Sequence, residues 1–175
     1  METAHRVGML LAARGLGLVY GGGGIGLMGA VADGALAAGG NVIGIIPASL
    51  AQREVAHVGL HDLRIVASMH ERKAQMADLA DGFLALPGGI GTFEEFFEIL
   101  TWAQLRLHTK PCALLNISGY YDPVLTLLDH AVSERFLRAE HRRIVLTDTD
   151  PEGLLDAMAV YQPPNVEKWL QRVEP

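Results

Sequence analysis

The chain has 175 residues, half of them hydrophobic and 19% charged, which is the composition of one soluble domain with a full hydrophobic core. The net charge of −6, with only three lysines and no basic run, argues against a nucleic-acid partner. No apolar stretch approaches the ~20 residues that span a bilayer, and Met1–Arg6 lacks the pattern of a signal peptide. We therefore expect a cytoplasmic protein that does not contact a membrane.

Helical and strand-like segments alternate along the chain. In the first half, periodicity predicts a helix at 2–14, a strand at 16–20, a helix from about Met28 that ends at Gly39-Gly40, and a strand at 41–46. Residues 48–62 read as a loop with a short helix, followed by a strand at 63–66 and a helix at 69–79. In the second half we expect strands at 83–86, 112–116 and 144–146, and helices that begin at Thr92, Asp122-Pro123 and Asp150-Pro151.

This alternation predicts the α/β class, a Rossmann-like parallel sheet with helices on both faces, in one nucleotide-binding domain over residues 1–175. In such folds the first strand usually lies at the centre of the sheet. Here the chain opens with a helix, so the first strand is apparently missing. We expect a sheet that lacks its central strand to be split.

The first glycine cluster, Gly21 to Gly24 followed by Gly26 and Gly29, formally matches a dinucleotide fingerprint. That fingerprint needs an acidic residue about 20 positions further on, and Gly44–Pro47 supplies none. One interpretation is a tight strand-to-helix turn with close packing. The other, which we favour, is that backbone amides of the run, including Gly22 and Gly23, line a nucleotide site without a nicotinamide cofactor.

The second cluster, Pro87 to Glu95, follows a strand and opens an amphipathic segment. Glycines allow close approach to a ligand, and the N–H groups of a helix N-terminus favour phosphate. We expect Glu94 and Glu95 in the first helical turn. Thr92 and Glu95 also fit a capping box, so Glu95 has a structural as well as a functional interpretation.

A third signal is Ser68 to Lys73. Ser68 and Glu71 fit a capping box, and Arg72 and Lys73 then lie close to a helix N-terminus, where cations oppose the helix dipole. Two such cations indicate an anionic ligand nearby, although a solvated charged turn explains them equally well.

Other chemistries lack support in the sequence. His57 and His61 are four apart but have no flanking glutamate or cysteine pair, so we expect no metal. Cys112 lies in an apolar run and reads as a buried strand residue. No nucleophile elbow or Walker lysine is present.

Together these motifs resemble the LONELY GUY family, cytokinin-activating nucleoside-monophosphate phosphoribohydrolases long mislabelled as lysine decarboxylases. The family hallmark Pro-Gly-Gly-x-Gly-Thr-x-x-Glu is matched at Pro87–Glu95, and Met-x-x-Arg-Lys at Met69–Lys73. The glycine run and the segment Thr101–Gln104 are also similar to the family.

The resemblance implies hydrolysis of the N-glycosidic bond of a cytokinin riboside 5′-monophosphate or AMP, without a cofactor, by a homodimer with sites near the subunit interface. It makes Arg72 and Glu95 the catalytic pair. It places further residues around the substrate, namely Glu54, Lys73, Gly88, Gly89, Ile90, Gly91, Thr92, Phe93, Glu94 and Thr101.

Physical chemistry is compatible with these roles. Cleavage builds positive charge on the ribose, which a carboxylate such as Glu95 stabilises, and Arg72 can bind phosphate bidentately. Glu95 beside a helix N-terminus should stay ionised, and Glu54 is a candidate second carboxylate, so the proton donor to the base stays open. A non-catalytic nucleotide- or cofactor-carrier protein is the alternative. Lysine decarboxylation is disfavoured because no pyridoxal-phosphate lysine is recognisable.

Overall fold

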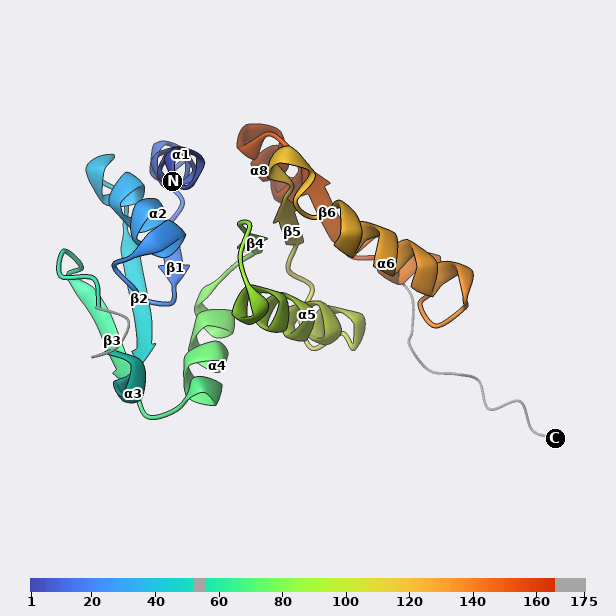
Figure 1. Cartoon of the computed structure of the whole chain (residues 1–175), viewed down its shortest axis with the longest axis horizontal. Helices are drawn as coiled ribbons and strands as arrows, with labels where there is room; N and C mark the ends of the chain where they lie inside the picture. Colours follow the sequence, from blue (N-terminus) through green and yellow to red (C-terminus); the bar gives the residue numbers. More distant parts are fainter. Residues whose placement is uncertain (52–55, 166–175) are drawn as a thin grey trace. The chain divides into compact units, whose positions relative to one another are not determined.

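The computed structural model describes residues 1–51 and 56–165. The chain forms two compact units, Met1–Ala80 and Asp81–Pro175 (Figure 1). Each unit holds parallel strands flanked by helices, which confirms the predicted Rossmann-like α/β class. A single domain over the whole chain stays a prediction.

The first unit contains a three-stranded sheet in the order β1-β2-β3. Leu18 pairs with Val42 at the start of β1, and Ile43 pairs with Asp62 at the start of β3. Its elements are α1 (Glu2–Ala13), β1 (Leu18–Tyr20), α2 (Gly26–Ala37), β2 (Val42–Pro47), α3 (Ala48–Ala51), β3 (Asp62–Val66) and α4 (Met69–Leu79).

The core of the first unit packs Tyr20 and Val42 against Ala32 and Ala35 of α2. Helices α1 and α2 pack closely at glycines. A Cβ on Gly8 would lie 2.0 Å from the carbonyl oxygen of Val31, so only glycine permits this approach. The packing keeps α2 fixed behind the glycine run that follows β1.

The second unit contains a three-stranded sheet in the order β4-β5-β6. Leu84 pairs with Ala113, and Ala113 pairs with Leu146. Its elements are β4 (Phe83–Ala85), α5 (Ile90–Gln104), β5 (Cys112–Leu115), the 3-10 turn η1 (Ile117–Gly119), α6 (Asp122–Ser133), α7 (Ala139–Arg142), β6 (Val145–Asp148) and α8 (Pro151–Ala159).

Strand β5 is the centre of this core, with all four residues buried. Cys112 has no exposed surface, which confirms the buried strand cysteine, and burial raises the pKa of its thiol to about 12. Such a thiol stays protonated and is a poor nucleophile.

Helix starts are predicted well where a side chain caps them. The hydroxyl of Ser68 accepts a hydrogen bond from the Glu71 amide at 3.1 Å, and Asp150 accepts one from the Gly153 amide at 3.1 Å. The Glu71 carboxylate reaches the amide of Ala67 at 2.8 Å, one residue beyond the expected partner. At α6 the N-cap is Tyr121, and Asp122 is already helical.

The predicted Thr92 cap is wrong. Helix α5 begins at Ile90 with Gly89 as its N-cap, so Thr92 is its third residue. The first turn holds no acidic residue, and Glu94 and Glu95 lie in the second turn. The helix starts earlier because the two glycines end the turn without a capping side chain. The helix dipole acts mainly on the first turn, so it gives little support to an ionised Glu95.

Smaller differences have simple causes. The strand predicted at 41–46 extends one residue further, because Pro47 is the last residue of β2, opposite Val66. The helix α7 and the turn η1 were not predicted, since each is too short to show periodicity. The strands of the described residues form two separate sheets, so the expected split is confirmed, whereas the missing first strand stays a prediction.

Candidate active site

Predicted site residues of both units lie near the carboxyl ends of parallel strands, where open α/β sheets bind their ligands. In the first unit these are the residues after β1 and the start of α4. In the second unit they are the residues between β4 and α5.

Arg72 is the fourth residue of α4 and is only 7% exposed. Its Nε donates to the carbonyl oxygen of Ile45 at 3.2 Å, and Nη1 lies 3.8 Å from the Met69 sulfur. An arginine stays charged even when buried. Arg72 therefore supplies a fixed positive charge near the carboxyl end of β2. Because the residue is buried, the alternative interpretation of a solvated charged turn does not hold for it.

A glycine not predicted as a site residue makes room for this guanidinium. A Cβ on Gly21 would lie 2.0 Å from Nη2 of Arg72. The glycines predicted from the sequence as site residues are the next two. Gly22 has a φ of +76° and accepts a hydrogen bond from the His57 amide at 3.0 Å, while Gly23 pairs with Ala56. All three glycines are buried.

Gly22 and Gly23 therefore have a structural role, because they bind the backbone of Ala56 and His57, which precede β3. In the same region a Cβ on Gly29 would lie 2.3 Å from the carbonyl oxygen of Gly24, so this part of the run is a tightly packed turn. The function of Gly22 and Gly23 as ligand-binding amides stays a prediction. Gly21 directly follows β1, and this position was the only signal for it in the sequence.

Two further predicted residues belong to the first unit. Lys73 is partly buried next to Arg72 on α4. Glu54 lies outside the described residues. Their roles in binding substrate stay predictions.

The glycine-rich turn of the second unit leads directly into α5. A Cβ on Gly88 would lie 2.1 Å from Oγ1 of Thr92 and 2.8 Å from its Cβ, so only glycine fits there. Gly89 and Gly91 are exposed, with open space where a Cβ would stand, and Ile90 is 83% exposed. The first N–H groups of a helix have no acceptor within the helix. This turn thus combines an accessible backbone with a 15-residue helix behind it, the arrangement that binds anions.

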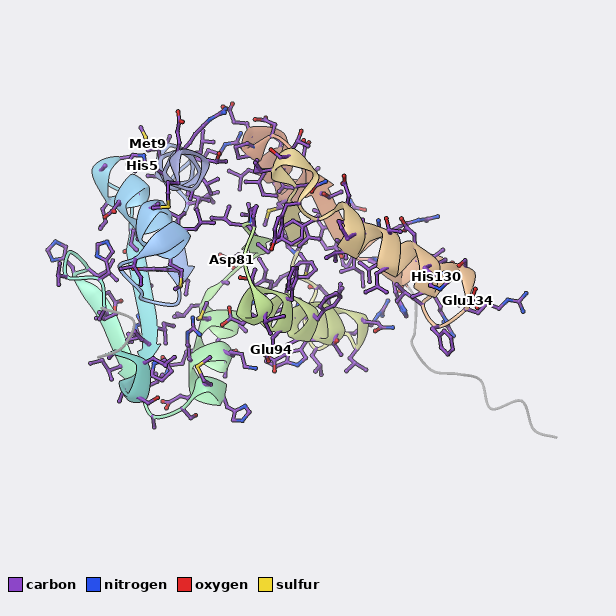
Figure 2. All side chains as sticks on the ribbon, in the orientation of Figure 1. His5, Met9, Asp81, Glu94, His130 and Glu134 are labelled. Atoms are coloured by element: carbon purple, nitrogen blue, oxygen red, sulfur yellow. The ribbon has the colours of Figure 1, made fainter. Side chains whose placement is uncertain are left out.

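The two neighbouring glutamates of α5 differ in environment. Glu94 is exposed (Figure 2), whereas Glu95 is partly buried. Partial burial fixes a carboxylate better than full exposure does, so Glu95 is the better candidate for a defined chemical role.

Not all predicted residues of this unit gather at the turn. Thr101 lies roughly 16 Å along α5 from Ile90, and its exposed hydroxyl donates to the Phe97 carbonyl oxygen at 2.7 Å. Phe93 is partly buried in a cluster of aromatic rings. Its ring lies parallel to that of Tyr120, with centroids 6.4 Å apart, and edge-on to that of Tyr121 at 6.2 Å.

These two tyrosines contact the turn and were missed from the sequence. The Tyr120 hydroxyl donates to the carbonyl oxygen of Gly88. The Tyr121 hydroxyl donates to the carbonyl oxygen of Leu86 at 2.5 Å. Asn116 accepts a hydrogen bond from the Tyr121 amide at 2.7 Å. Their position just after β5, next to the strand that precedes the turn, was the only signal in the sequence.

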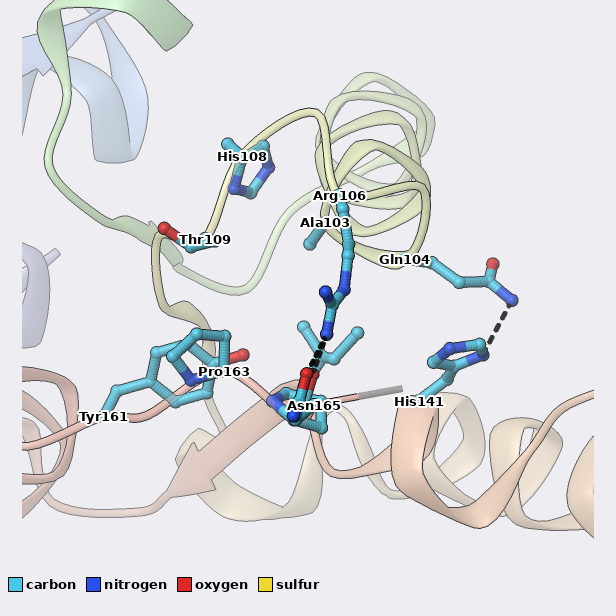
Figure 3. A pocket seen from close by; sticks show the side chains of 11 residues that line it. Ala103, Gln104, Arg106, His108, Thr109, His141, Tyr161, Pro163 and Asn165 are labelled. Carbon is cyan, nitrogen blue, oxygen red and sulfur yellow. Dashed lines mark hydrogen bonds between the residues drawn. The ribbon is translucent and has the colours of Figure 1, made fainter. Parts of the chain in front are cut away.

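A separate cavity of about 300 Å³ lies in the second unit (Figure 3). Arg106 crosses it to donate to the Asn165 side chain at 2.8 Å, and Gln104 contacts His141 at 3.2 Å. Burial lowers the pKa of His108, another lining residue. No predicted site residue lines this cavity.

The described residues contain no group of three His, Cys, Asp or Glu side chains able to hold a metal. No helix among them is long and apolar enough to cross a membrane.

The fold and the candidate site residues define a class: a Rossmann-like α/β protein with a glycine-rich turn at a helix start and a buried arginine, each near the carboxyl ends of parallel strands. The same fold occurs in solved structures of low sequence identity. A molybdenum cofactor binding protein from the phototrophic bacterium Rippkaea orientalis is 23% identical, with a TM-score of 0.67 over 90% of this chain and 85% of that one. The molybdenum cofactor carrier protein of Chlamydomonas reinhardtii is 22% identical, with a TM-score of 0.63 over 89% and 83%.

Sequence similarity is more specific. Residues 28–158 match the family model described as "possible lysine decarboxylase". The cytokinin riboside 5′-monophosphate phosphoribohydrolase LOG of Oryza sativa is 49% identical over 93% of this chain and 67% of the relative. The corresponding protein of Rhodococcoides fascians is 50% identical over 90% and 80%. LOG2 of Arabidopsis thaliana is 45% identical over 93% and 75%. The chain belongs to this family, LOG, which confirms the resemblance found in its motifs.

Proposed function

We propose that the protein hydrolyses the N-glycosidic bond of cytokinin riboside 5′-monophosphates or AMP and releases the free base and ribose 5-phosphate. The observation that carries this proposal is the 49% identity over 93% of the chain with a relative named for that reaction. The anion-binding turn before α5 and the buried charge of Arg72 suit a phosphorylated substrate.

The reaction needs few groups. The oxygen of water bonds to C1′ of the ribose and loses a proton, the bond from C1′ to the base breaks with its electron pair going to the base, and the base takes up a proton. We assign Glu95 to stabilising the positive charge that develops on the ribose or to orienting the water. We assign Arg72 to holding the phosphorylated ribose as a fixed cation, with Lys73, Glu54 and the amides of the turn around the substrate.

The assay is release of adenine or isopentenyladenine from the corresponding monophosphates, measured chromatographically. We expect Glu95→Gln and Arg72→Ala each to lower kcat/KM by at least about 100-fold. Residues of the same types outside the proposed site supply matched controls: the exposed Glu134 as Glu134→Gln, and Arg64, whose side chain is 40% exposed, as Arg64→Ala, both with unchanged activity. Undiminished activity in both site variants would refute the assignment.

Two other functions give different outcomes in the same assay. Tight binding of AMP without release of base would favour a nucleotide- or cofactor-carrier protein. Carbon dioxide release from lysine would favour decarboxylation, which the family description names. Of the three lysines in the sequence, Lys110 follows α5 and Lys73 lies on α4 beside the proposed catalytic arginine.

We also propose a cytoplasmic homodimer. A nucleoside monophosphate is an intracellular metabolite, which supports the compartment. The position of Thr101, far along α5 from the turn, supports a site near a subunit interface, since a second copy can supply a residue that one chain keeps distant. Leu105 and Leu107, 44% and 69% exposed, are apolar groups that such an interface would cover. Light scattering coupled to gel filtration measures the state, and a monomer at assay concentration would contradict it.

A further inference from the structure

We infer that Tyr120 and Tyr121 are positioning residues that hold the glycine-rich turn in the orientation in which its Gly89 amide faces the phosphate of the substrate. The inference deepens the proposed function and rests on it for the identity of the substrate. It is drawn from the two hydrogen bonds by which adjacent tyrosines hold two carbonyl groups of one turn.

The hydrogen bond from Tyr120 fixes a direction. The peptide group between Gly88 and Gly89 is trans, and a planar trans peptide points its C=O and its N–H in opposite directions. Because the Gly88 carbonyl points toward Tyr120, the Gly89 N–H points away from it. The Gly89 amide lies at the N-cap of α5, on an exposed residue, where a bound anion is favoured.

The second hydrogen bond anchors the start of the same turn. The Leu86 carbonyl precedes Pro87, whose nitrogen carries no hydrogen, so this peptide offers only an acceptor. Tyr121 takes up that acceptor and is 1% exposed. Burial raises the pKa of its hydroxyl to about 12, so it remains a donor across the physiological range.

The tyrosines are themselves held in place. Strands β4 and β5 are parallel neighbours, so the residues that follow each strand meet at one edge of the sheet. Asn116, 8% exposed, accepts from the Tyr121 amide and donates to Asp122 Oδ1 at 2.7 Å. The rings of the two tyrosines pack edge to face with centroids 5.1 Å apart. Rigid support of this kind is what an aligned ligand-binding turn requires.

Tyr120→Phe is the most direct variant. Tyr120 is 44% exposed, so the change removes one hydroxyl from the surface and keeps the ring beside Phe93. The matched control is Tyr161→Phe, a tyrosine of the same unit that lines the separate cavity and whose burial raises its hydroxyl pKa to about 12, as for Tyr121. Tyr121→Phe, with its melting temperature measured in parallel, tests the second hydrogen bond.

The first experiment needs no catalysis. Inorganic phosphate is titrated into ¹⁵N-labelled full-length protein, and the Gly89 amide resonance is followed. We expect saturable binding in the parent protein and in Tyr161→Phe, and about fivefold weaker binding in Tyr120→Phe, the equivalent of one neutral hydrogen bond. Equal affinity in all three, or no response of Gly89 to phosphate, would overturn the inference.

The second experiment uses the monophosphate substrate and the corresponding nucleoside. A positioning role predicts a KM for the monophosphate about fivefold higher in Tyr120→Phe at nearly constant kcat, with unchanged turnover of the nucleoside. A merely structural role would lower both substrates' rates together and lower the melting temperature. If the parent protein releases no base, the proposed function fails, and the phosphate titration still decides whether the tyrosines orient the turn.

Discussion

Gly21 is the residue whose substitution best separates the site from the fold. An alanine Cβ there would lie 2.0 Å from Nη2 and 3.0 Å from Cζ of Arg72, against about 3.4 Å for ordinary van der Waals contact. The guanidinium must therefore retreat by about 1.4 Å. Since Nε of Arg72 lies 3.2 Å from the Ile45 carbonyl oxygen, a shift of that size breaks the hydrogen bond.

The expected effect falls mainly on activity. Misplacement of a catalytic group by about 1 Å costs on the order of 100-fold, or about 2.7 kcal/mol of transition-state stabilisation. The clashing atoms belong to the far end of a flexible side chain, which can move without shifting the backbone. We therefore expect Gly21→Ala to lose about as much kcat/KM for AMP as Arg72→Ala, with a loss in free energy of unfolding near 1 to 2 kcal/mol from the broken hydrogen bond.

The matched control lies at the other end of the same strand. Gly17 precedes β1, and a Cβ there would meet nothing closer than 3.7 Å. Gly17→Ala should leave base release unchanged and raise stability by a few tenths to about 1 kcal/mol. Full activity in Gly21→Ala would refute the reasoning, because the arginine would then have moved by more than 1 Å without consequence.

Three further predictions concern stability, each measured by denaturant or thermal unfolding. Gly88→Ala should lower the free energy of unfolding by about 1 to 3 kcal/mol, because its Cβ would lie 2.8 Å from Cβ of Thr92. Gly91→Ala, where a Cβ would meet open space, should be neutral or stabilising. Equal effects of the two substitutions would contradict the close contact. Ser68→Ala should cost about 1 kcal/mol through loss of the N-cap of α4, and an unchanged midpoint would show that the cap contributes nothing. The pKa of Cys112 is raised on folding, so its contribution is complete below pH 9 and is lost as the pH rises toward 12. Above pH 9 the free energy of unfolding should fall by up to ~1.4 kcal/mol per pH unit from this thiol, and Cys112→Ala should remove that part of the slope.

The order of helices and strands was predictable because local patterns carry it. Helix α4 spans Met69–Leu79 as expected, and its Ser68 cap is visible in the sequence as a serine before an amphipathic run. The start of α5 was not predictable from the same grammar. Thr92 has the side chain of a cap, but Gly88 and Gly89 complete the turn first, and the threonine packs on Gly88 instead.

The sequence by itself determined the α/β class, the family and the two motifs around Arg72 and Glu95, because strand and helix periodicity and glycine spacing are local properties. Tertiary structure alone decided which residues support those motifs. Gly21 makes room for an arginine 51 positions away in the chain. Tyr120 and Tyr121 bind carbonyls more than 30 positions upstream. Such contacts arise from pairing of parallel strands, which brings distant segments to one sheet edge, and no local pattern records them.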